Sequence, residues 1–84
     1  MNIVIEFNSS AFKHGINEDA IRHAIINAVV YYDIWDDDAD KHLLLGFDNV
    51  GRLLEIMYNV VDDKSINVFH AMKCRSNYYH LLSK

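Results

Sequence analysis

Hydrophobic and polar residues recur along this 84-residue chain with two different periods, which predict several strands and one long helix. Residues 2–7 alternate and are mostly apolar, as is typical of a short strand. A single helical turn is expected over residues 10–14, ending at Gly15. Residues 18–30 predict the main helix, with Asn17 as its N-cap. Its apolar stripe consists of Ile21, Ala24, Ile25, Ala28 and Val29.

The rest of the chain alternates between β-branched or aromatic runs and short polar segments. The aspartate-rich residues 36–40 are expected to form a solvated loop, because like charges repel one another at a strand centre. Residues 48–51 have the composition of a tight turn, and residues 75–82 predict a short final helix. Strands are predicted at residues 31–35, 41–48, 52–61 and 66–70.

The longest predicted strand, at residues 52–61, indicates how the elements pack. Its alternate apolar residues should face the helix, because one face of such a strand has to be buried. On the last long strand, Ile66, Val68 and His70 are expected to share one side. The chain is therefore predicted to be a single α+β domain over residues 1–84. An N-terminal strand and helix would pack on one face of an antiparallel sheet of about four strands, followed by a short C-terminal helix. The helix-facing residues would be Leu54, Ile56, Tyr58 and Val60.

Charge is divided unevenly along the chain, whose net charge is −4. Residues 1–40 carry two cations against eight acidic residues, a net −6, and residues 41–84 carry six cations against four, a net +2. A globally acidic chain argues against non-specific nucleic-acid binding, but a local cationic end is still effective within about 10 Å. No apolar run approaches the roughly 20 residues of a membrane span, and the first residues lack the features of a signal peptide.

Cations and a histidine gather at the ends of the last two long strands. Arg52 follows a glycine at the start of one strand, and His70, Lys73 and Arg75 stand at the end of the other. Antiparallel pairing would bring these residues to the same end of the hairpin. Simpler interpretations exist, because His70 also fits a hydrogen-bonded core histidine and Arg52 a solvated edge charge.

Cysteine and metal chemistry are not expected from this sequence. Cys74 lies between Lys73 and Arg75, which would lower the pKa of an exposed thiol, but no paired base is near it in sequence. A single cysteine cannot form an internal disulfide, which fits a cytoplasmic setting. The histidines and aspartates lack recognisable metal-ligand spacing, so neither a metal site nor another cofactor is predicted.

Several short motifs follow one another in a characteristic order. They are K-H-G-I-x-E-D-x-I-R-H-A at residues 13–24, L-L-x-G at 43–46, G-R-L-L-E-I at 51–56, H-A-M-x-x-R at 70–75 and a terminal Tyr-Leu segment. In order, spacing and length, this series resembles the BrnT-like toxins and the related DUF4258-type domains, small members of the RelE-like superfamily. The resemblance covers nearly the whole chain and implies a RelE-like fold.

The resemblance implies the toxin of a type II toxin–antitoxin system. Such a toxin would be a metal-independent endoribonuclease acting on RNA in the cytoplasm. A small DNA-binding antitoxin protein would neutralise it, and the two would form an oligomer. The family's basic residue after a glycine matches Arg52, its basic group after the last strand matches Arg75 with His70 and Lys73 close by, and its Lys-His-Gly matches Lys13, His14 and Gly15.

RNA cleavage without a metal requires a base for the 2′-hydroxyl, an acid for the leaving 5′-oxygen and cations for the charged phosphorane. Histidine suits both proton transfers because its unperturbed pKa is about 6.5. His70 is the first candidate, and His14 is either a second catalytic residue or a cap of the preceding helical turn. Arginine suits the third role because its fork matches phosphate oxygens. Tyr78 and Tyr79 are candidates for stacking on an unpaired base.

A non-catalytic function is the alternative. The chain would then be a degenerate RelE-fold module that binds a protein partner resembling an antitoxin and cuts no RNA. The acidic balance and the small number of basic residues after the last strand favour this alternative.

Overall fold

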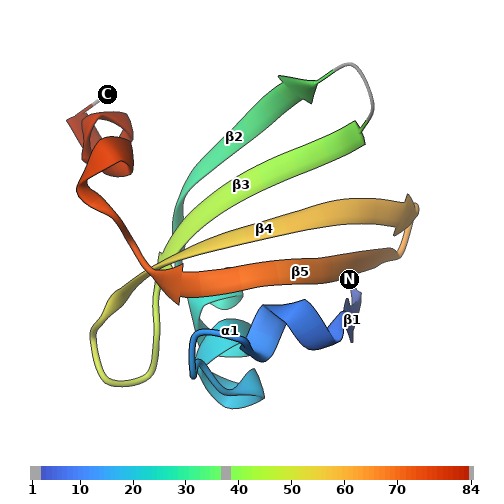
Figure 1. Cartoon of the computed structure of the whole chain (residues 1–84), viewed down its shortest axis with the longest axis horizontal. Helices are drawn as coiled ribbons and strands as arrows, with labels where there is room; N and C mark the ends of the chain where they lie inside the picture. The colour runs from blue at the N-terminus through green and yellow to red at the C-terminus, as the bar shows by residue number, and fades with distance from the viewer. Residues whose placement is uncertain (1–2, 37–38, 84) are drawn as a thin grey trace.

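The computed structural model describes residues 3–36 and 39–83, which form a curved five-stranded sheet with helical segments on both faces (Figure 1). The α+β class predicted from the sequence is confirmed. In chain order the elements are β1 (Val4–Phe7), the 3₁₀ helix η1 (Ser9–Phe12), α1 (Glu18–Ile26), β2 (Ala28–Asp36), β3 (Ala39–Phe47), β4 (Leu53–Asp62), β5 (Ser65–Lys73) and the 3₁₀ helix η2 (Ser76–Ser83).

The strands lie in the order β1-β5-β4-β3-β2, so the first and second strands of the chain form the two edges. β2 to β5 make an antiparallel meander, and β1 pairs in parallel with β5. The four predicted antiparallel strands are therefore confirmed as β2 to β5. The prediction was wrong for the N-terminal strand, which joins the sheet as a fifth, parallel strand in place of packing on its face. Backbone hydrogen bonds from Val4 N to Lys64 O and from Asn8 N to Val68 O, both 2.8 Å long, attach β1 to the edge of β5. Such long-range pairing leaves no mark in the local sequence.

α1 begins where the sequence predicted and ends earlier. The Asn17 side chain accepts a hydrogen bond of 2.8 Å from the backbone N–H of Ala20, so the predicted N-cap is confirmed. The helix stops at Ile26, whereas the prediction extended it to residue 30. Val29 and the residues beside it belong instead to β2, because β-branched side chains favour strands and β3 supplies hydrogen-bonding partners.

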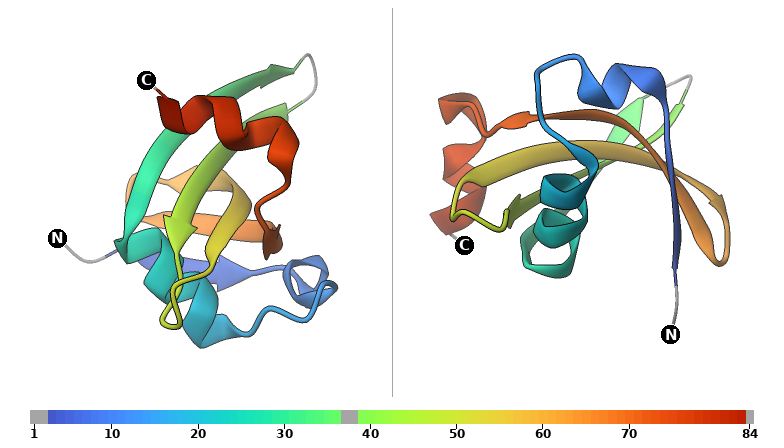
Figure 2. Two further views of the ribbon diagram at one scale, coloured as in Figure 1. Left: turned by 90° about the vertical axis from the view of Figure 1, so that its left-hand side faces the viewer. Right: turned by 90° about the horizontal axis from the view of Figure 1, so that it is seen from below.

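Two hydrophobic clusters hold α1 and η2 on opposite faces of the sheet (Figure 2). β3 contributes to both, because Leu44 packs towards α1 while Leu43 and Leu45 pack towards Leu81 of η2. Leu54 and Ile56 are fully buried in the cluster that contains α1, and Tyr58 packs against it, so the predicted helix-facing side of β4 is confirmed for these three residues. Val60 is exposed and lies outside this cluster, so its prediction was wrong.

The turns follow the predicted chemistry, with one exception. Gly51 completes the turn of residues 48–51 with φ of +86°, and Gly15 follows η1 with φ of +81°. The aspartate-rich segment is not a loop throughout, because Asp36 pairs with Ala39 at the end of the β2–β3 ladder. A strand end tolerates charge better than a strand centre, since it lies close to water. Residues 37–38 of the predicted loop lie outside the described residues.

The final helix is confirmed as η2, although it is a 3₁₀ helix and begins one residue later than predicted. No helix in residues 3–36 and 39–83 is long and apolar enough to cross a membrane.

A substitution at Gly46 tests how closely α1 packs on the sheet. A Cβ atom at this position of β3 would lie 1.9 Å from the carbonyl oxygen of Ala24 in α1. Gly46→Ala should therefore cost about 3 kcal/mol of unfolding free energy, because backbone cannot move aside cheaply. Gly51→Ala meets open space and strains only the positive φ, at a cost of about 1 kcal/mol. Urea denaturation measures the unfolding free energy of each variant. An equal loss of unfolding free energy in Gly46→Ala and Gly51→Ala would contradict the prediction.

Candidate functional site

The candidate site is built around the carboxylate of Glu55, which is fully buried within the apolar sequence of β4. It lies on the face of the sheet that η2 covers. Four donors surround it, one of which is Arg75 Nε, 3.1 Å from Oε1 and 3.2 Å from Oε2. Its Oε1 accepts a 2.9 Å hydrogen bond from the backbone N–H of Arg75, and its Oε2 accepts one of 2.7 Å from Arg75 Nη2. His70 Nε2 lies 2.8 Å from the same Oε2. The carboxylate therefore joins β4, β5 and the segment that leads into η2.

A bulge in β5 places His70 in this site. Met57 is opposite His70 and Tyr58 is opposite Val68, so Phe69 has no partner across the β4–β5 ladder. The extra residue reverses the alternation of side chains, and His70 faces Glu55 while Val68 faces α1. Ile66 and Val68 share one side as predicted, and the prediction was wrong for His70. Local alternation carries no sign of the bulge.

The electrostatics of the site keep Glu55 ionised. Burial raises the pKa of Glu55, but the hydrogen bonds from Arg75 and His70 outweigh burial and hold the pKa below its ordinary value. The hydrogen bond and charge of Glu55 in turn raise the pKa of Arg75. An ionised carboxylate can only accept hydrogen bonds, so Nε2 of His70 carries the proton between them. Nδ1 of His70 has no hydrogen-bonding partner among the described residues.

His14 joins the site from the other end of the chain. Its ring lies edge-on to His70, with centroids 5.6 Å apart. The hydroxyl of Ser10 donates a 2.6 Å hydrogen bond to the carbonyl oxygen of Phe69 and so fastens η1 to the bulge. His14 lies two residues after the end of η1 and is exposed. The bulge thus presents His70 and also anchors the segment that carries the second imidazole.

Arg52 lies at the same end of the β4–β5 hairpin, as predicted, because the start of β4 pairs with the end of β5. Its own partner is a different carboxylate. Asp48 is a buried residue that accepts hydrogen bonds from the Arg52 backbone N–H at 2.8 Å and from its Nε at 2.6 Å. Burial raises the pKa of Asp48, but the hydrogen bonds from Arg52 and Val50 hold it below its ordinary value. Arg52 is therefore first of all a component of the β3–β4 turn.

The remaining predicted residues are distributed around the site. The Arg75 side chain is half exposed, and its guanidinium carbon lies 5.8 Å from the centre of the Tyr78 ring. Tyr79 is exposed on η2. Lys73 is opposite Leu54 in the ladder, so strand alternation directs it to the face that carries α1, away from Glu55. The structure thus brings together His14, His70, Arg75 and Tyr78, and it separates Lys73 from them.

Cys74 and metal binding add nothing to this site. Cys74 is buried in the cluster beneath η2, and burial, followed by the charge of Glu55, raises the pKa of its thiol. The thiol is therefore not activated in the way that an exposed one between two cations would be. Among the described residues, no group of three or more His, Cys, Asp or Glu side chains is placed to hold a metal ion.

Sequence analysis missed the two buried carboxylates, Glu55 and Asp48. A signal for Glu55 is present, because it interrupts the apolar run Leu53 to Ile56 and a charge inside a strand must be paired. The sequence does not identify the partner of Glu55, because Arg75 is twenty residues further along the chain. As a whole, the site holds two neighbouring imidazoles, one of them oriented by a carboxylate, beside a half-exposed guanidinium. Such a set can move protons and bind a phosphate.

The lowered pKa of Glu55 predicts a pH-dependent contribution to stability. A carboxylate whose folded pKa is lowered stabilises the fold fully above its ordinary pKa, here about 4.5, and loses that effect as pH falls through the folded value. The wild type should therefore lose more unfolding free energy than Glu55→Gln between about pH 5 and pH 3. The unfolding free energies can be measured by urea denaturation at each pH. An equal loss in the two proteins as the pH falls would contradict this prediction. At neutral pH, Glu55→Gln should be less stable than Glu18→Gln, which breaks only the exposed pair with Arg22.

Comparisons with known proteins identified no relative of this chain. No protein-family model, no curated protein and no solved structure matches this chain. The resemblance to BrnT-like toxins therefore stays a prediction from the motifs, and the function has to be argued from the site.

Proposed function

We propose that this protein is the toxin of a type II toxin–antitoxin system and cleaves RNA without a metal ion. The observation that carries the proposal is the imidazole pair of His14 and His70, with ring centroids 5.6 Å apart beside the guanidinium of Arg75. A base, an acid and a phosphate-binding cation are the three components that such cleavage requires.

His70 is the general base in this proposal. Its Nε2–H donates to the ionised Glu55, which leaves Nδ1 as the ring nitrogen that accepts a proton. A buried carboxylate in this position orients the imidazole and stabilises the imidazolium that forms, as the aspartate does in a serine-protease triad. Glu55 is a positioning residue, because it acts through His70 and does not touch the substrate.

His14 is the general acid. It is exposed, and its ring stands against that of His70, so one phosphodiester can contact both imidazoles. The 2′-oxygen loses its proton to His70 and attacks the phosphorus. The bond from phosphorus to the 5′-oxygen breaks, and His14 gives its proton to that oxygen. The products are a cyclic phosphate and a free 5′-hydroxyl, and the two histidines have exchanged protonation states.

Arg75 stabilises the charge of the phosphorane. Nε and Nη2 of its guanidinium bind Glu55, and the half-exposed side chain turns the remaining donors towards solvent. Tyr78, next to this guanidinium, and the exposed Tyr79 supply faces for stacking an unpaired base. Arg52 and Lys73 lie outside this cluster and contribute by attracting the RNA backbone.

One observation favours the alternative of a non-catalytic module. Arg75 of the proposed site and Arg52, which lies outside it, both bind buried carboxylates, so part of their positive charge is neutralised within the fold. In that case the same fold would pair with a protein partner and leave RNA intact. Under either proposal the protein acts in the cytoplasm and forms an oligomer with a small DNA-binding antitoxin.

RNA cleavage by the purified protein tests the proposed roles. His70→Gln and His14→Ala should each lower the cleavage rate by about 10²–10⁴-fold, because each removes one proton-transfer group. Glu55→Gln should lower the rate through His70. His23→Ala is the matched control and should leave the rate unchanged, since His23 is exposed on α1 and bonds only to the backbone of its own helix.

Circular dichroism of each variant separates loss of the fold from loss of chemistry. Cleavage that persists in folded His14→Ala and His70→Gln would overturn the site assignment. RNA that stays intact with the wild-type protein at high concentration, together with unimpaired growth of bacteria expressing it, would replace the catalytic proposal with the non-catalytic one.

A further inference from the structure

The far edge of the sheet has the features of a strand-binding site. β2 forms this edge, and it pairs with β3 along one side only. Along its other side, no backbone group of this nine-residue strand is paired with another strand in residues 3–36 and 39–83. The opposite edge is different, because β1 has only four residues. Soluble proteins usually shorten, charge or cover a long edge strand, since an open one pairs with other chains.

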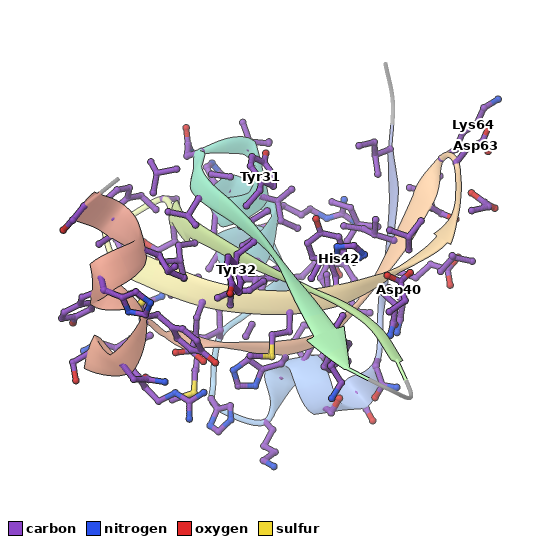
Figure 3. The ribbon with its side chains drawn as sticks, turned by 90° about the horizontal axis from the view of Figure 1, so that it is seen from above. Tyr31, Tyr32, Asp40, His42, Asp63 and Lys64 are labelled. Atoms are coloured by element: carbon purple, nitrogen blue, oxygen red, sulfur yellow. The ribbon has the colours of Figure 1, made fainter. Side chains whose placement is uncertain are left out.

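The edge of β2 is lined by apolar side chains on both faces of the sheet. Val29 and Tyr31 are 54% and 68% exposed, and Tyr32 is 48% exposed. Tyr31 is opposite Leu44, whose side chain packs towards α1, and Tyr32 is opposite Leu43, which packs towards η2. Figure 3 shows the two tyrosines on opposite sides of the β2 ribbon.

A hollow adjoins β2 on each face of the sheet. The hollow on the α1 face has a volume of about 400 Å³ and extends from Tyr31 of β2 past the end of α1 to Ile3 and Ile5 at the β1 edge. The hollow on the η2 face has a volume of about 230 Å³ and includes Leu81 in its wall. Successive side chains of a strand added beside β2 would point alternately into these two hollows. The α1-face hollow is lined by Ile3, Ile5, Arg22, Ile25, Ile26 and Tyr31.

Charge distinguishes the two ends of the edge. The end of β2 contains Asp33 and Asp36, and the start of β3 contains Asp40 followed by Lys41, so acidic residues outnumber cations at this end by three to one. Asp40 has an exposed side chain, which accepts a 2.6 Å hydrogen bond from Nε2 of His42 (Figure 3). The other end, at Ala28 and Val29, carries no charge of its own. An added strand therefore meets negative charge at one end only.

We propose that β2 binds an extended segment of a partner protein as an added antiparallel strand. The segment has apolar side chains on both faces and Lys or Arg at its N-terminal end, because antiparallel pairing places that end beside the aspartates. Main-chain hydrogen bonds supply affinity, and the two hollows and the acidic end supply specificity.

A second copy of this chain fits the edge less well. It would bring another acidic N-terminal half and no cation to the aspartates, at a net charge of −4 per copy. The proposed edge is also independent of RNA cleavage, because β3 separates β2 from Glu55 on the central strand β4, and His70 lies further away on β5. Either proposal can fail without the other.

Two synthetic peptides of identical composition test the proposal. Both contain seven alternating Val and Ile residues and two lysines, which stand at the N-terminus in one peptide and at the C-terminus in the other. Fluorescence anisotropy with the full chain should show that the N-terminal-lysine peptide binds at least about tenfold more tightly at low salt. High salt should reduce the difference, since it screens the lysine–aspartate attraction.

Two variants of the protein test whether the peptide binds at β2. Tyr31→Glu places a charge on the edge and should weaken binding at least about tenfold, because burying an unpaired charge is costly. Val61→Glu is the matched control. It makes the same charge change at a residue of similar exposure on β4 and should leave binding unchanged. Amide hydrogen exchange should become slower in β2 when the peptide is bound.

Several results would overturn the proposal. They are equal binding of the two peptides or binding of neither, slowed exchange in β1 in place of β2, and binding unaffected by Tyr31→Glu. Sedimentation that shows a dimer of the free chain, lost in Tyr31→Glu, would assign the edge to a second copy and overturn it as well.

Discussion

The structure depends on the ionised carboxylate of Glu55 in the interior of the sheet. A buried charge is tolerated only when it is paired and fully hydrogen-bonded, and Arg75 and His70 meet this condition together. Because Glu55 binds both residues, the end of β5 is held against β4, and the chain is directed into η2. Leu81 and Cys74 then cover the same face. One carboxylate thus couples the pairing of two strands to the packing of the C-terminal helix.

The bulge at Phe69 is the second part of the same arrangement. Without it, His70 would face α1, and Glu55 would lose one of its donors. Its carbonyl oxygen also binds Ser10, which holds η1 beside the last strand. A single irregularity in β5 therefore aligns side chains from both ends of the chain. Irregularities of this kind commonly direct a side chain into a site, and the adjacent rings of His14 and His70 fit that use.

Structural and chemical requirements compete for the same groups in this small domain. The arginine that would bind phosphate is also the counter-ion of Glu55, and the imidazole that would act as base is its hydrogen-bonding partner. Such sharing gives a rigid and oriented site, and it makes substitution of any member affect stability as well as chemistry. β2, at the opposite edge, is free of this conflict, since its exposed tyrosines lie apart from Glu55 and its partners.

The sequence by itself determined the elements that depend on neighbouring residues. Asn17 caps α1, Gly15 and Gly51 adopt positive φ, and the α+β class follows from the order of apolar patterns, because each of these rests on contacts a few residues apart. Only the tertiary structure decided the parallel pairing of β1 with β5 and the pairing of Glu55 with Arg75. These link residues distant in the chain, whose meeting depends on how the whole sheet closes. The bulge at Phe69 belongs to the same group, because it depends on the contacts of β5 with Glu55 and with η1. Strand alternation alone predicts a regular strand there.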